Sequence, residues 1–147
     1  MSFVLIEPSG AYSLHMGAPS RAALTALLGG VPETVETGYD VLGVKAGDSD
    51  LLQWTRNPVA GAMLATLGAA WWPHSGPIVF ADRAKRRSRE VVSLTSDTLS
   101  AVSALHQDVS WALGIDGMIV PASPQESVPV AEILKAADYV RSGRLYV

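Results

Sequence analysis

The chain has 147 residues, of which 48 % are hydrophobic and 17 % charged, which is enough apolar material for the core of one ordinary domain and argues against long disorder. A net charge of −3 argues against a protein that coats nucleic acid, and the lack of cysteine excludes disulfides, thiolate zinc sites and cysteine nucleophiles. The longest apolar stretch, 59–72, is shorter than the about 20 residues of a membrane span, and no signal peptide is visible. We therefore expect a soluble, cytoplasmic protein.

Strand and helix signals alternate along the chain, bounded by turn and cap residues. We expect strands at 3–6 and 12–16, a helix at 20–28, strands at 31–36 and 39–45, a helix at 58–67, strands at 78–80 and 91–92, a helix at 95–110 and, after a proline-containing connector, a short helix at 130–141. The clearest start is Asn57-Pro58, because asparagine can cap free N–H groups and proline loses nothing at the first helical position.

The strand pairs are joined by short links, which favours antiparallel pairing. The sequence thus predicts an α+β fold, a mainly antiparallel sheet with three or four helices packed on it, in a single domain. We expect the α+β core to span 1–113. Residues 114–147 are expected to form a Pro-containing connector followed by a C-terminal helix and tail.

Several short motifs occur in a familiar order. VLIEP opens the chain, a helix ends in Gly-Gly, a strand pair follows, and then come an Asn-Pro-led segment, GPIVF and a helix capped by Ser-Leu-Thr. Over about residues 1–113 this order resembles a domain family of unknown function carried by phages, plasmids and other mobile elements. The resemblance implies an accessory protein that works inside a bacterial cell, and it supplies no catalytic residues.

A basic run lies in the link between the strands expected at 78–80 and 91–92. It holds five of the 11 Lys and Arg residues, namely Arg83, Lys85, Arg86, Arg87 and Arg89. Without them six basic residues face 14 acidic ones, a balance of −8, so the run is a local basic island. Two interpretations stay open: a solvated loop whose charges oppose edge aggregation, which is favoured, and a site for nucleic acid, a nucleotide or an acidic surface.

Trp71 and Trp72 are the second candidate binding feature. Neighbouring side chains on a strand point to opposite faces, so both rings cannot enter one core from the same strand. One tryptophan in the core and one covering a helix end is the simpler interpretation. An exposed tryptophan is also typical of a protein interface.

Motifs for catalysis or metal binding are missing. The three histidines, His15, His74 and His106, are widely spaced, and the Asp48 and Asp50 pair is more simply a turn. Glu7 at a strand end lacks an evident catalytic partner, and no nucleophile elbow or phosphate-binding loop is found. We expect no metal site and no cofactor.

The function expected from these features is that of a non-enzymatic accessory protein of a mobile element that binds a host or defence macromolecule, most often a protein. The alternatives are nucleic-acid or nucleotide binding through 83–89 and a hydrolase without a recognised motif. The apolar C-terminal tail, 128–147, is expected to dock on its own domain or to cross to a second copy in a homodimer. We expect no association with a membrane.

Overall fold

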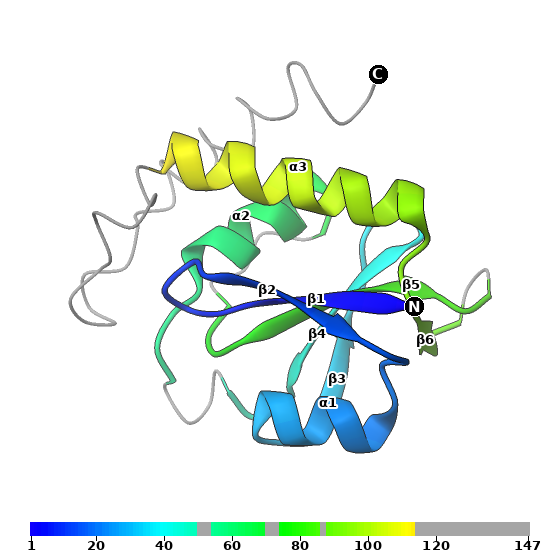
Figure 1. The fold of residues 1–147 in the computed structure, drawn as a ribbon. Coiled ribbons are helices and arrows are strands. Elements are labelled where there is room, and N and C mark those ends of the chain that lie inside the picture. The colour runs from blue at the N-terminus through cyan, green and yellow to red at the C-terminus, as the bar shows by residue number, and fades with distance from the viewer. Residues whose placement is uncertain (50–53, 70–73, 86–87, 114–147) are drawn as a thin grey trace.

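The computed structural model of the protein describes residues 1–49, 54–69, 74–85 and 88–113. Within these ranges helices cover both faces of a mainly antiparallel sheet (Figure 1). The elements are β1 (Ser2–Ile6), β2 (Tyr12–Met16), α1 (Arg21–Leu28), β3 (Pro32–Val35), β4 (Val41–Ala46), α2 (Pro58–Thr66), β5 (Ile78–Arg83), β6 (Val91–Val92) and α3 (Ser96–Ala112). The predicted α+β class is confirmed.

The strands run in the order β2-β1-β5-β4-β3, and the short β6 pairs with the end of β5. All of these pairings are antiparallel. The sequence predicted the three neighbouring pairs but not their order. Because β5 lies between β1 and β4, the two N-terminal hairpins meet only through a strand that follows them by more than 30 positions in the chain.

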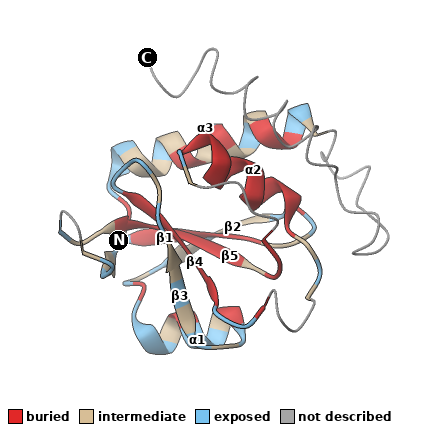
Figure 2. Cartoon of the chain, turned by 180° about the vertical axis from the view of Figure 1, so that it is seen from behind, coloured by how far each residue is buried: buried red, intermediate tan, exposed pale blue. Residues whose placement is uncertain are grey.

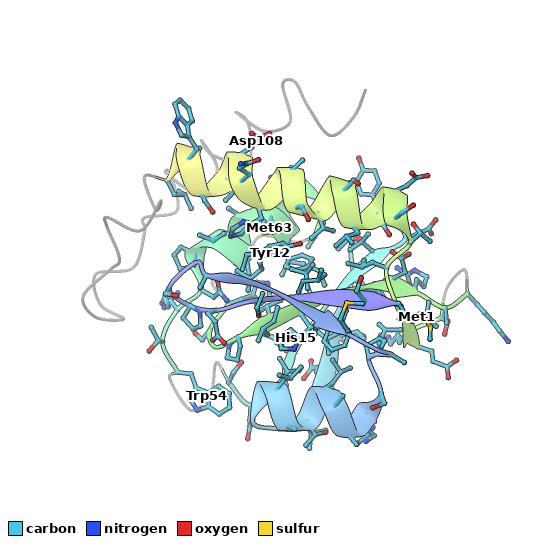
Figure 3. The ribbon with its side chains drawn as sticks, viewed as in Figure 1. Met1, Tyr12, His15, Trp54, Met63 and Asp108 are labelled. Carbon is cyan, nitrogen blue, oxygen red and sulfur yellow. The ribbon has the colours of Figure 1, made fainter. Side chains whose placement is uncertain are left out.

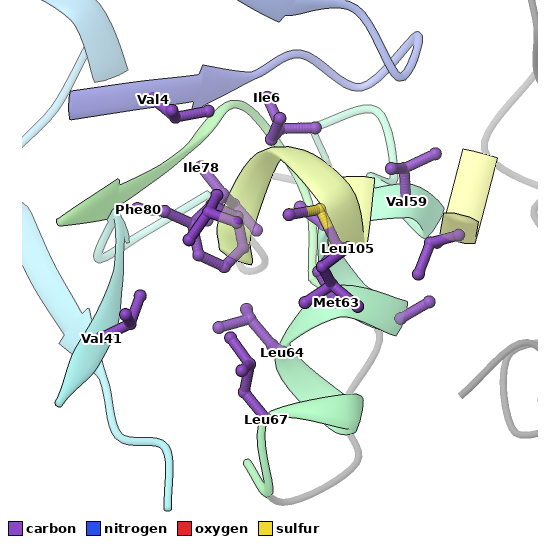
Figure 4. Close-up of a cluster of buried hydrophobic side chains, with 14 of the residues drawn as sticks. Val4, Ile6, Val41, Val59, Met63, Leu64, Leu67, Ile78, Phe80 and Leu105 are labelled. Carbon is purple, nitrogen blue, oxygen red and sulfur yellow. The ribbon is translucent and has the colours of Figure 1, made fainter. Parts of the chain in front are cut away.

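Alternate side chains of the sheet enter two separate cores (Figure 2). On the upper face the strands pack against α2 and α3 (Figure 4), through Val4, Ile6, Ile78, Phe80, Met63, Leu64 and Leu105. On the lower face they pack against α1, through Phe3, Leu5, Val44, Val79, Leu24 and Leu28. Every residue of α2 is buried, so α2 is an internal helix, and it packs together with α3 on this face of the sheet.

Asn57 begins α2 as the sequence predicted. Its Oδ1 accepts a hydrogen bond from the Ala60 N–H at 3.1 Å, and Pro58 takes the first helical position. The other end of the amide reaches further: Nδ2 donates to the carbonyl oxygens of Ile6 and Gly76, both at 2.9 Å. Asn57 is 1 % exposed. It therefore joins the end of β1, the entry to β5 and the start of α2.

The start of α3 is fixed in a similar way. Thr95 caps the helix through a bond from the Thr98 N–H at 3.2 Å, as expected from the sequence. Asp82 in β5 adds a second anchor, because its Oδ2 accepts from the Thr95 N–H and from the Thr98 hydroxyl, each at 3.0 Å. The buried carboxylate thus ties the central strand to α3.

The ends of the elements differ from the sequence prediction in a few places. The connection between β3 and β4 is longer than predicted, because β3 ends at Val35 and β4 begins at Val41. In this connection the Thr37 hydroxyl donates a hydrogen bond to Val41 O. α2 ends at Thr66, ahead of Gly68, whose φ of 89° is left-handed. The helix expected at 130–141 and the C-terminal tail lie outside the described residues. Within the described ranges, no helix combines the length and apolar character needed to cross a bilayer.

Replacing Asn57 with Ala should lower the free energy of unfolding by about 3 kcal/mol, because one helix cap and two buried hydrogen bonds are lost together. Urea denaturation followed by circular dichroism measures this change. The control is Ser20→Ala, which removes only the exposed cap of α1, a bond from the Ala23 N–H at 3.2 Å. It should cost about 1 kcal/mol. Equal costs for the two variants would show that the long-range bonds of Asn57 contribute nothing.

Candidate binding surface

The side chain of Arg83, the first cation of the basic run, makes contacts inside the folded domain. Its Nη2 lies 2.7 Å from Oε2 of Glu36, in the connection between β3 and β4, and its Nη1 donates to Ser88 O at 2.7 Å. Its side chain is 9 % exposed. The guanidinium therefore holds the base of the loop against the neighbouring hairpin and is not presented to solvent.

The two partners change each other's pKa. The hydrogen bond from Arg83 holds the pKa of the Glu36 carboxyl below its ordinary 4.5, with further help from the charges of Arg83 and Arg89. The same hydrogen bond raises the pKa of Arg83. Both groups therefore stay ionised at neutral pH, and the contact is a true ion pair.

The next two described cations of the run face solvent. Lys85 is exposed, and the side chain of Arg89 is 81 % exposed with its Nε 4.0 Å from Glu36 Oε1. Glu90 is also exposed beside them. The remaining predicted cations, Arg86 and Arg87, lie outside the described residues. Lys85 and Arg89 are thus the described side chains of the run that can meet an external anion.

An open hollow of about 430 Å³ lies at the same end of the molecule. Its walls are mostly apolar and consist of Met1, Ala18, Pro19, Ser20, Val91, Val92, Ser93 and Leu94. Two of these side chains project strongly: Met1 is 85 % exposed and Val92 44 %. Figure 3 shows Met1 at this end, close to β6. Exposed apolar side chains at the rim of a hollow make this end of the molecule a candidate binding surface.

The hollow and the basic loop share one strand. Val91 in β6 forms part of the hollow and pairs with Arg83 in β5. Arg89 precedes Val91 by two positions, and the Ala84 N–H donates to Glu90 O at 2.8 Å, which closes the loop above β6. The loop that carries the exposed cations therefore leads directly into the strand that forms part of the hollow.

The predicted tryptophan pair, Trp71 and Trp72, lies outside the described residues. A different tryptophan has a visible packing role: the ring of Trp54 lies over Gly76, where a Cβ atom would come within 2.8 Å of its Cε3. Gly76 also has a φ of 78°, so glycine is required there on two grounds. Trp111, near the end of α3, is 66 % exposed.

A contact between Lys45 and His74 had not been predicted. Lys45 Nζ lies 3.3 Å from His74 Nδ1, and the residues are 8 % and 6 % exposed. His74 O also accepts from the Asn57 N–H at 2.9 Å. The pair connects β4 to the segment before β5, and no sequence motif marks residues so far apart.

The other predicted candidates are distributed over the fold. His15 stacks on Phe3, with ring centroids 5.5 Å apart, whereas His106 Nε2 bonds to Gly10 O at 2.7 Å. Asp48 lies in the expected turn after β4, and Asp50 lies outside the described residues. Over the described ranges, no three His, Asp or Glu side chains are placed to hold a metal ion together.

Comparisons with protein-family models, with curated proteins and with solved structures find no match to this chain. The geometry of its surface is therefore the basis for inferring its function.

Replacing Glu36 with Gln should lower the free energy of unfolding at pH 7 by about 0.5 kcal/mol, a value typical of an ion pair with one exposed partner. The folded pKa of Glu36 is depressed, so its contribution is complete above the ordinary value of 4.5 and is lost as the pH falls through the folded value. Urea denaturation at a series of pH values tests this. The free energies of unfolding of the native protein and the variant should become equal at acid pH. A difference that stays constant with pH would contradict the ion pair between Glu36 and Arg83.

Proposed function

We propose that this protein is a non-enzymatic accessory protein that binds another protein, and that the hollow beside the basic loop is the binding site. The observation that carries the proposal is the apolar hollow with Met1 and Val92 exposed at its rim. An apolar anchor buried at the centre of an interface supplies most of its affinity. The hollow is large enough for one or two such side chains.

The charges beside the hollow define the partner further. Lys85 and Arg89 are exposed within a few residues of Val91, whereas the rest of the chain is acidic on balance. Rim charges favour an oppositely charged partner and raise the association rate. The occupant we propose is therefore a protein segment in which an apolar side chain stands next to acidic residues.

The setting is also proposed. The short motifs from VLIEP to Ser-Leu-Thr resemble domains of mobile elements, and on that resemblance we place this protein among the accessory proteins of such elements. The partner would then be a host or defence protein of a bacterial cell. The second alternative is a hydrolase without a recognised motif.

The exposure of Lys85 and Arg89 favours one second candidate, the binding of nucleic acid or a nucleotide through the same loop. Phosphate contacts release counterions, so such binding would weaken steeply with added salt. It would not depend on the apolar hollow. That difference separates the two candidates.

A random peptide library displayed on phage and selected on the full chain should enrich peptides with an apolar residue beside Asp or Glu. A fluorescent peptide of the enriched sequence should bind Val92→Ser about tenfold more weakly, since an apolar contact is lost. Fluorescence anisotropy measures the affinity. The double variant Lys85→Ser, Arg89→Ser should lose affinity mainly at low salt, because exposed charges are screened.

The matched control is Val31→Ser, which alters a residue that is 63 % exposed next to the Gly47 end of β4, away from the basic loop. Its affinity should equal that of the native chain. Failure to enrich any sequence, or equal binding to Val92→Ser, would reject the hollow as the site. A labelled single-stranded DNA that binds the native chain and Val92→Ser alike, but not the double variant, would favour the second candidate instead.

A further inference from the structure

β2 is an outer strand, and no described strand pairs with its free side. Two hydrogen bonds show which of its backbone groups face outward: Gly17 N–H donates to Met1 O, and Glu7 N–H donates to Ala11 O, both at 2.9 Å. Along an antiparallel ladder, hydrogen-bonded residue pairs alternate with pairs that are not hydrogen-bonded. Because Gly17 and Ala11 are in hydrogen-bonded pairs, the backbone groups of His15 and Ser13 between them also bond to β1. The N–H and C=O groups of Tyr12, Leu14 and Met16 therefore point away from the sheet.

The opposite edge of the sheet is protected against pairing. The same alternation in β3, starting from the bond between Gly47 N–H and Val31 O, directs the backbone of Pro32 and Thr34 outward. Pro32 has no N–H to offer, and Glu33 adds a charge. Proline and charged residues are the usual means by which exposed edges avoid association.

β2 lacks both of these features. Its sequence, Tyr-Ser-Leu-His-Met, holds no proline, no glycine, no lysine and no carboxylate. Two of its three even-numbered side chains are apolar and exposed, Leu14 by 46 % and Met16 by 76 %, and the third, Tyr12, is partly buried against the upper core. Tyr12 lies on the same face, where its hydroxyl meets Ser103 of α3 at 2.7 Å. This edge is suited to pairing along its whole length.

We propose that β2 pairs antiparallel with β2 of a second copy, about a twofold axis at Leu14. In that register Leu14 lies opposite Leu14 of the second copy, and Tyr12 lies opposite Met16. Each of the three outward-facing residues then forms a hydrogen-bonded pair, with about six bonds across the axis.

The pattern is self-complementary, which is the requirement of a twofold interface. The three outward-facing residues are symmetric about Leu14, and their side chains share one face. The pairing therefore brings Leu14 against its own copy and covers Met16 with the tyrosine of the other copy. Aromatic and aliphatic cross-strand pairs of this kind stabilise sheets. The strand also holds no lysine, arginine or carboxylate that would repel the same strand of a second copy.

This dimer goes beyond the proposed binding of a partner protein and does not depend on it. The residues of the hollow belong to the N-terminus, the segment after β2 and the segment around β6, and none belongs to β2 itself. The interface is also distinct from an exchange of the C-terminal tail, which lies outside the described residues. A single short strand pair buries little surface, so we expect a reversible dimer with a Kd in the micromolar range.

Sedimentation velocity of the full chain over a range of concentrations tests the proposal. The native chain should pass from monomer to dimer, whereas Leu14→Lys and Leu14→Glu should each remain monomeric because like charges meet at the axis. An equimolar mixture of these two variants should recover the dimer. Recovery in the mixture would show that the two charges meet at the axis, and thermal unfolding checks that each variant is folded.

Two further variants complete the design. Met16→Lys alters a side chain that is 76 % exposed and should raise the dissociation constant about tenfold if Leu14 variants fold poorly. Val92→Ser, which changes only the hollow, should dimerise like the native chain. A native chain that stays monomeric at the highest concentration, or a dimer that persists in Leu14→Lys, would overturn the proposal.

Discussion

The side-chain amide of Asn57 connects three segments that are far apart in the chain. Its oxygen caps α2, and its two protons are donated to the carbonyls of Ile6 and Gly76. Aspartate has no such donors and serine is too short, so no other common cap residue makes all three bonds. The position of α2 depends on this amide. Because α2 is wholly buried and packs with α3 and the strands in the upper core, this amide helps to place the helices on that face of the sheet.

Local features of this fold were predictable from sequence, and distant ones were not. Asn57 and Thr95 cap helices where the sequence indicated, because capping is a contact within a few residues. The insertion of β5 between β1 and β4 depends on pairing between segments that no local signal relates. The Lys45 and His74 contact went unpredicted for the same reason.

The basic run shows how one sequence feature can divide between structure and surface. Five neighbouring cations look equivalent in the sequence, but Arg83 is held by Glu36 across 47 positions and is largely buried. Arg89 stays in solvent beside an apolar hollow that composition alone does not reveal. The sequence indicated where charge accumulates, whereas the structure distinguishes the cation that anchors the loop from those that face outward.

The central place of β5 has a consequence for synthesis on the ribosome. The two hairpins that flank it emerge first, yet neither can join the other until residues 78–83 have been translated. Until then each nascent hairpin presents an unpaired inner edge, and α3, which packs on the upper face, has not yet been made. Exposed surface of this kind leads incomplete chains to aggregate. The non-local pairing also slows folding once synthesis is complete. This small protein should therefore depend on chaperones more than its length suggests.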